Sequence, residues 1–156
     1  TGSTAGQMGA AWGWYMISPN WKDLWPDAVN MPLDYETKEL AKVVVLMTDG
    51  EFNTAHCKGV QSQTYGYTSI PNSDRINCDP AETPFQQAAH FCTNMKDEGI
   101  IVYTVGFELD AGSEGEDFLR DCATDVSHAY LAASSAELKA AFKSIATQIS
   151  RLRISK

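Results

Sequence analysis

The residues best placed to do chemistry are Thr48-Asp49-Gly50, which follow an apolar run from Val43 to Met47. An apolar run of this length, β-branched at its start, is typical of a strand that is buried on both faces in a parallel sheet. Ligands of open α/β sheets bind beyond the carboxyl ends of the strands, so we expect Asp49 to lie where a ligand or metal would bind. The alternative interpretation is that Asp49-Gly50 is only a turn signal.

Length and composition indicate one globular domain. The chain has 156 residues, of which 44% are hydrophobic and 21% charged, and its formal net charge is -8. A nucleic-acid partner would call for a basic patch, so this charge argues against one. The sequence has no stretch of 18 apolar residues, and we therefore expect no membrane contact by this segment. Because the chain begins with Thr1 rather than Met, we expect a piece of a longer protein with any membrane anchor upstream.

Four cysteines, Cys57, Cys78, Cys92 and Cys122, allow three pairings. Their spacing contains no C-x-x-C, which argues against a zinc ribbon or a thioredoxin-type redox site. A metal site that begins with His56 beside Cys57 is a less favoured alternative. We predict that Cys57 pairs with Cys78 and Cys92 with Cys122, and that the domain resides in an oxidising compartment.

Strands and helices alternate after residue 43, which predicts an α/β fold with a parallel sheet and right-handed crossovers. Strands are predicted over 43–48, 100–106 and 128–131. Helices are predicted to begin at Thr83-Pro84, at Ser113-x-x-Glu116 and at Ser134-x-x-Glu137, each with a capping signal. The apolar stripes of the first and last of these helices are Phe85, Ala88, Ala89, Cys92 and Met95, and Leu138, Phe142, Ile145, Ile149 and Leu152.

The segment before residue 43 is predicted to form one amphipathic helix and a long loop. The helix has Thr4 near its start, ends at Ser18-Pro19, and its apolar residues recur with helical spacing at Met8, Ala11, Trp12, Tyr15 and Met16. Residues 20–38 show no period and contain Trp21 and Trp25, so we predict a loop that lays aromatic side chains over the core.

Two polar segments leave alternatives open. Residues 51–83 form a polar insertion with Cys57 and Cys78 near its ends, which either shapes a binding surface or has no role. The acidic turn over 108–117 is compatible with calcium, but it lacks EF-hand spacing, and helix capping by Ser113 and Glu116 is the favoured interpretation.

Several motifs together resemble a known family. Val43 to Glu51, with its Thr-Asp-Gly, resembles the third-loop strand of von Willebrand factor A (VWA) domains, and Gly2-Ser3-Thr4 resembles their Gly-x-Thr loop. Both loops belong to the metal-ion-dependent adhesion site (MIDAS). Three further segments resemble the VWA region of bacterial TadG-like proteins of the Tad/Flp pilus-assembly system: Trp12-Gly13-Trp14, Asp121-Cys122-Ala123-Thr124 and Leu152-Arg153. The resemblance covers nearly the whole chain and implies a Rossmann-like, three-layer VWA fold.

The resemblance also implies a metal site. VWA domains hold a divalent cation, usually Mg²⁺, with hydroxyls and aspartates from three loops, and a partner's carboxylate completes the shell. Mg²⁺ takes six oxygen ligands and keeps several waters. Thr4 corresponds to the threonine of the second loop and Asp49 to the aspartate of the third. The first loop, Asp-x-Ser-x-Ser, is absent from this sequence, so we expect weak or no Mg²⁺ binding by this chain.

The absent loop belongs to the N-terminal part of the VWA sheet. The resemblance implies that these strands precede Thr1, which would leave strand 43–48 as an open apolar edge. Such an edge is a template for pairing with another chain, and we therefore predict a homodimer through residues 43–48.

Three functions follow as alternatives. The first is an extracytoplasmic interaction module, without catalysis, that serves pilus assembly or adhesion by binding a protein partner. The second is a structural envelope domain of the same fold with a vestigial metal site. The third is a hydrolase or phosphoryl-transfer enzyme that uses Asp49 and Glu51 with a metal. The sequence has no phosphate loop with lysine and no Gly-x-Ser-x-Gly elbow, which argues against the enzyme.

Overall fold

The computed structural model describes residues 4–24, 31–50, 52–53, 56–57, 60–61 and 83–154. Its helices are α1 (Gly6–Ile17), α2 (Pro84–Asp97), α3 (Glu114–Cys122) and α4 (Ser135–Ile154), with short 3₁₀ helices η1 (Pro19–Leu24) and η4 (Val126–His128). The strands are β1 (Val43–Thr48), β2 (His56–Cys57), β3 (Val60–Gln61), β4 (Ile101–Phe107) and β5 (Ala129–Ala132). None of the described helices is long and apolar enough to cross a membrane.

The main sheet has three parallel strands in the order β1-β4-β5, and a separate antiparallel pair joins β2 to β3. Val43 pairs with Ile101 and Thr48 with Gly106, so β1 and β4 are in register along their whole shared length. The central strand β4 is buried at every position from Val102 to Gly106. The predicted α/β fold with a parallel sheet is therefore confirmed.

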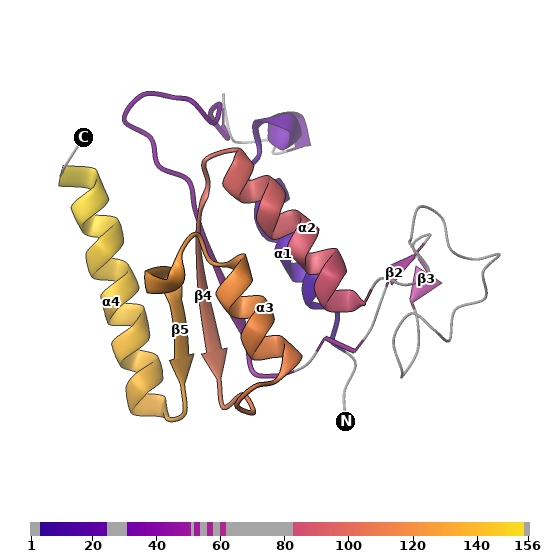
Figure 1. Ribbon diagram of the computed structural model, residues 1–156. Coiled ribbons are helices and arrows are strands. Elements are labelled where there is room, and N and C mark those ends of the chain that lie inside the picture. Colours follow the sequence, from indigo (N-terminus) through magenta and orange to yellow (C-terminus); the bar gives the residue numbers. More distant parts are fainter. Residues whose placement is uncertain are drawn as a thin grey trace.

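Helices cover both faces of this sheet, which gives three layers (Figure 1). Helices α1, α2 and α3 lie on one face, where Val44 and Val102 join a core with Met95 and Leu119. Helix α4 lies on the other face, where Tyr103 and Val105 pack with Ile145. Successive side chains of β4 thus point alternately into two separate cores.

The expectation that strand 43–48 is buried on both faces is wrong. Val44 is buried, but Val45 is 39% and Met47 44% exposed. Within the described sheet β1 is an edge strand, and α4 extends over β4 and β5 rather than over β1. The apolar run predicted the strand correctly, but it does not show which faces of the strand are covered by other elements.

The expected apolar face of α1 is wrong at three of its five residues. Met8, Trp12 and Met16 are exposed, whereas the buried residues of the helix are Gln7, Ala10 and Ala11. Small residues allow the close approach: a Cβ atom at Gly13 would lie 3.8 Å from the Cγ1 atom of Val44. The helix is apolar almost all round, so periodicity alone did not select its inner face. Its N-cap is Ala5, with no side-chain hydrogen bond, and Thr4 lies just before it, near the start of the helix as expected.

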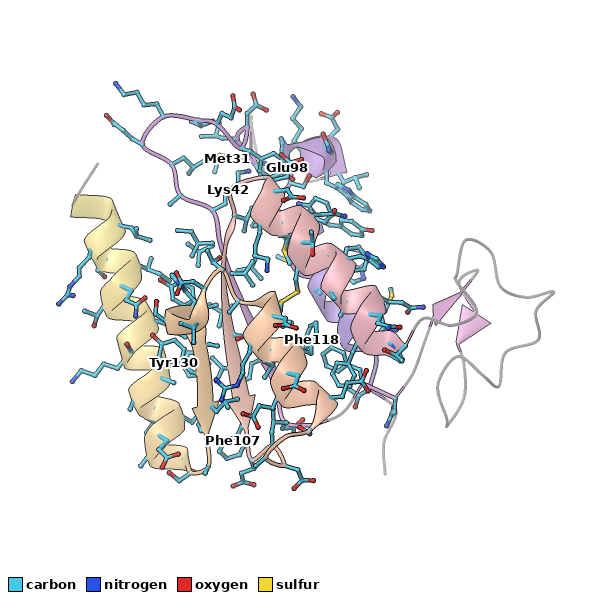
Figure 2. The ribbon with its side chains drawn as sticks, viewed as in Figure 1. Met31, Lys42, Glu98, Phe107, Phe118 and Tyr130 are labelled. Atoms are coloured by element: carbon cyan, nitrogen blue, oxygen red, sulfur yellow. A yellow bond between two sulfur atoms is a disulfide. The ribbon has the colours of Figure 1, made fainter. Side chains whose placement is uncertain are left out.

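The predicted loop before β1 fastens the start of that strand. Trp21 stacks on Tyr15 with ring centroids 4.1 Å apart, while Trp25 lies outside the described residues. The Lys42 ammonium donates to the carbonyl oxygens of Ile17 and Leu33, which joins α1 and the loop to β1. Figure 2 shows Lys42 at the amino end of the sheet.

Capping signals placed the later helices correctly. Thr83 and Gln86 form a reciprocal capping box at the start of α2. At α3 the Ser113 hydroxyl accepts from the Glu116 N–H, but the Glu116 carboxylate reaches one residue further back and accepts from the Gly112 N–H at 2.8 Å. Ser134, Glu137 and Ala133 repeat this arrangement at α4.

The predicted disulfide between Cys92 and Cys122 is confirmed, and it joins α2 to α3 with a Cα–Cα distance of 5.1 Å. The predicted Cys57–Cys78 bond lies outside the described residues, as does most of the 51–83 insertion. Both Cys92 and Cys122 are buried in the core beneath β1 and β4.

Replacing Cys92 and Cys122 together by alanine should lower the free energy of unfolding by about 3 to 4 kcal/mol, because the cross-link closes a loop of 30 residues in the unfolded chain. Urea denaturation followed by circular dichroism measures the change. An unchanged unfolding midpoint would contradict the stabilising role of this bond.

Candidate functional site at the carboxyl end of the sheet

Asp49 is exposed directly beyond the carboxyl end of β1. The buried Thr48 side chain forms the turn beneath it: its hydroxyl donates to the Gly50 carbonyl oxygen at 3.0 Å and accepts from the Gly50 N–H at 3.3 Å. The Thr48 hydroxyl is thus engaged by the backbone, and the Asp49 carboxylate is the group that this turn presents.

The segment that contains Thr4 reaches the same end of the sheet. The Thr4 N–H donates to Asn53 Oδ1 at 2.8 Å, and the Asn53 N–H donates to the Thr4 carbonyl oxygen at 3.0 Å. Gly6 is required here, since a Cβ atom at this position would lie 1.9 Å from the ring of Phe52. These contacts tie the two predicted ligand segments together a few residues beyond Asp49. Sequence reasoning missed Asn53, which no motif indicated.

An aromatic cluster supports these segments from below. The rings of Phe52 and Phe85 stack at 4.6 Å, and Phe118 lies 5.3 Å and 5.4 Å from them. The three residues come from the turn after β1, from α2 and from α3. Figure 2 shows Phe118 between α2 and α3. Burial of the cluster fixes where the chain beyond Asp49 can run.

A hollow of about 80 Å³ lies beside Asp49. Its lining comes from the turn after β1, from the loop after β4 and from the start of α3: Asp49, Gly50, Glu108, Leu109, Asp110, Ser113 and Gly115. For the acidic turn that contains Glu108 and Asp110, the sequence left calcium and helix capping open and favoured capping by Ser113 and Glu116. The position of Glu108 and Asp110 in the sequence could have placed them at the site. They directly follow strand β4 and therefore lie at the same end of the sheet as Asp49.

Glu116 holds the loop after β4 in place and does not line this hollow. The Gly112 N–H donates to one carboxylate oxygen at 2.8 Å, and the Arg120 guanidinium donates to the other at 2.7 Å. The backbone hydrogen bond from Gly112 and then the bond from Arg120 lower the pKa of Glu116 below its ordinary value. The charged form of Glu116 is therefore the one that stabilises this loop.

The described residues supply an incomplete donor set for a cation. Asp49 offers a carboxylate and Thr4 a hydroxyl, whereas Mg²⁺ takes six oxygens. Across the described ranges, no three His, Cys, Asp or Glu side chains are arranged to hold a metal ion, and this includes the acidic turn weighed for calcium. Assignment of Thr4 and Asp49 as ligands therefore stays a prediction. The side chains of His56, Cys57 and Glu51 lie outside the described part of the chain.

Comparison with known proteins adds one structural likeness. No family model matches the sequence, and no curated protein matches it significantly. The structure is similar to the vWF domain of the type V pili tip protein Mfa5 from Porphyromonas gingivalis, with a TM-score of 0.60 and 16% sequence identity. The match covers 95% of this chain and 68% of that one. The fold is that of a von Willebrand factor A-like domain.

This likeness confirms the Rossmann-like, three-layer VWA fold that the motifs implied. Asp49 follows β1 and Thr4 lies just before α1, and the hydrogen bonds between Thr4 and Asn53 hold these two segments together at the carboxyl end of the sheet. At 16% sequence identity, this likeness shows a shared fold and does not show a shared function. The relation to TadG-like proteins and the metal ligands remain predictions.

Glu116→Gln should remove a pH dependence of stability. Because folding lowers the pKa of Glu116 from its ordinary value of 4.5, its contribution is present above that value and is lost as the pH falls through the lowered pKa. Urea denaturation from pH 7 down to pH 3 measures this. Asp117→Asn, in the same first turn of α3, is the matched control. Equal acid sensitivity of the wild-type protein and Glu116→Gln would contradict the assignment.

Proposed function

We propose that the domain is a non-catalytic protein-interaction module whose partner binds at the carboxyl end of β1. The single observation that carries the proposal is the VWA-like fold with Asp49 exposed at that end and the Thr4 segment bonded to the chain just after it. The loop after β4, with Glu108 and Asp110, borders the same edge. These loops offer a partner an exposed, acidic surface on a rigid support.

A divalent cation would connect this surface to the partner. Thr4 and Asp49 would hold it, as the VWA resemblance implies, together with donors that this sequence lacks, and a carboxylate of the partner would complete its shell. Hard oxygen ligands of this kind suit Mg²⁺. The hydrogen bonds between Thr48 and Gly50 fix the turn that carries the exposed Asp49 side chain.

The setting we propose is the assembly of a Tad/Flp-type pilus or pilus-mediated adhesion, outside the cytoplasm. Two observations support it: the motifs that resemble TadG-like proteins, and the fold shared with a domain of a pilus tip protein. The Cys92–Cys122 disulfide is consistent with an oxidising compartment. An upstream anchor would place the domain in the periplasm or at the cell surface.

Two competing proposals give the residues at the carboxyl end of β1 a different role. A structural envelope domain with a vestigial metal site would keep the fold and lose the requirement for Asp49. A metal-assisted hydrolase would need Asp49 and Glu51 as its acid, base or ligands. A hydrolase screen with and without Mg²⁺ separates the enzyme from both other readings, because only the enzyme would turn over substrate.

Mg²⁺ should bind this 156-residue chain weakly or not at all, since Thr4 and Asp49 are the only two ligands of the expected set in its sequence. Isothermal titration calorimetry with MgCl₂ measures this directly. Any residual heat should disappear in Asp49→Ala. A tight isotherm with one Mg²⁺ per chain would show that the donor set has been misjudged.

Asp49→Ala in the natural full-length protein should reduce piliation, because the cation and hence the partner's carboxylate lose their anchor. Electron microscopy and surface-pilin blots measure the effect. Asp97→Ala is the matched control, since it removes an exposed carboxylate at the end of α2 that does not line this hollow. Normal piliation with Asp49→Ala would favour the structural envelope domain instead.

A further inference from the structure

Lys42, the residue just before β1, is bonded to two segments that are distant from it in the sequence. Its ammonium group donates to the carbonyl oxygens of Ile17, at the end of α1, and of Leu33, in the loop before β1. The nitrogen of this group also lies 4.8 Å from the ring centroid of Tyr35, where a cation is attracted to an aromatic ring. We call Lys42, Tyr35 and the two carbonyl groups the Lys42 clasp.

The end of α1 that the Lys42 clasp holds has no charge of its own to stabilise it. The carbonyl groups of a last helical turn lack partners within the helix and carry partial negative charge. Helix α1 has no basic residue in its last turn, and Lys42 supplies the positive charge through the Ile17 carbonyl oxygen. Burial lowers the pKa of Lys42 below its ordinary value, and Asp34 acts in the opposite direction. The lysine is thus partly removed from water, and its bonds to two carbonyl groups offset this.

Tyr35 connects the Lys42 clasp to a further residue of α1. Its hydroxyl oxygen accepts from the indole N–H of Trp14 at 2.8 Å. Trp14 also packs against Phe91 of α2, with ring centroids 6.4 Å apart. The proposed function gives the Trp12-Gly13-Trp14 motif no role. In the structure, the last residue of this motif helps to hold the same end of α1.

Between its two ends, α1 packs through small residues. A Cβ atom at Gly13 would lie 3.8 Å from the Cγ1 atom of Val44 in β1, and Ala10 and Ala11 are buried. Small side chains permit a close approach, but they form no ridge that would oppose a shift of the helix along the strand. We infer that the position of α1 along β1 is set mainly by the attachments at its two ends.

The two attachments are as far apart as the two ends of β1. The 12 residues of α1 span about 18 Å, and the six residues of β1 span about 20 Å. At the start of α1, a Cβ atom at Gly6 would collide with the ring of Phe52, and Thr4 exchanges two hydrogen bonds with Asn53. Helix α1 therefore connects the Lys42 clasp, at the amino end of the sheet, with the Thr4 segment at the carboxyl end.

We propose that Lys42 is a positioning residue for the interaction site: by holding the end of α1, it sets where Thr4 lies relative to Asp49. This inference rests on the proposed function, which places Thr4 and Asp49 at the site. Asp49 itself is held by the register of β1 against β4. Loss of the ammonium group removes the charged attachment of α1 at the amino end of the sheet. The helix is then free to shift along β1, and the hydrogen bonds between Thr4 and Asn53 open more often.

Amide hydrogen exchange at Asn53, measured by NMR at neutral pH, tests this proposal in the 156-residue chain. The Asn53 N–H donates to the Thr4 carbonyl oxygen, so its exchange rate reports whether the two segments are held together. Lys42→Met should raise this rate about tenfold relative to the amides of β4, since hydrogen bonds from a charged group are lost. Lys42→Arg, whose guanidinium group can donate to both carbonyl oxygens, should restore most of the protection.

Two further variants separate positioning from a general loss of stability. Lys38→Met removes an exposed lysine of the same loop and should leave exchange at Asn53 unchanged. Tyr35→Phe keeps the ring beside Lys42 but removes the hydroxyl group that accepts from Trp14. It should raise the rate at Asn53 by a smaller factor, and it decides the question if Lys42→Met does not fold.

Unchanged exchange at Asn53 in folded Lys42→Met would overturn the proposal. So would an equal acceleration of the β4 amides, a Lys42→Arg variant that exchanges as fast as Lys42→Met, or an equal effect of Lys38→Met. Exchange at Asn53 requires neither a cation nor a partner, whereas piliation of the Asp49→Ala variant depends on both. The positioning role of Lys42 and the proposed function therefore fail in separate experiments.

Discussion

Pairing of β1 with the fully buried strand β4 is the interaction on which the rest of the structure depends. From Val102 to Val105, side chains of β4 are at most 1% exposed, so its place between the two cores is fixed. The parallel register then determines that β1 ends beside the last residues of β4, where Thr48 pairs with Gly106. That register puts Asp49 beside the loop that leaves β4 at Glu108.

Both ends of β1 are bonded to α1 or to the residues just before it. The site is therefore built by two chain segments and not by one sequence motif. At the amino end, Lys42 bonds to the carbonyl oxygen of Ile17. At the carboxyl end, Thr4 and Asn53 exchange two backbone-anchored hydrogen bonds, and Phe52 fills the space left by Gly6. Helix α1 is thus held along β1, and it supports the proposed interaction surface (Figure 1).

Local chemistry in the sequence was enough to predict the strands, the caps of α2, α3 and α4, and the Cys92–Cys122 bond, because each depends on neighbouring residues or on one helix face. What the sequence did not show is which apolar faces are covered. Val45, Trp12 and Phe142 read as core residues by type and spacing, yet they are exposed, since no described element lies over them. At the site, Asp49 was predicted because it follows a strand. The role of Asn53 depends on its hydrogen bonds to Thr4, which is distant in the sequence, and no local pattern predicts them.

Amide hydrogen exchange along β1, followed residue by residue by NMR, tests the central pairing most directly. In the observed register, the N–H groups of Val44, Leu46 and Thr48 donate to β4, so these three amides should be among the slowest to exchange in the chain. Fast exchange at all three positions, in a protein that is otherwise protected over β4, would show that β1 is not a strand of this sheet and that Asp49 is not where the account places it.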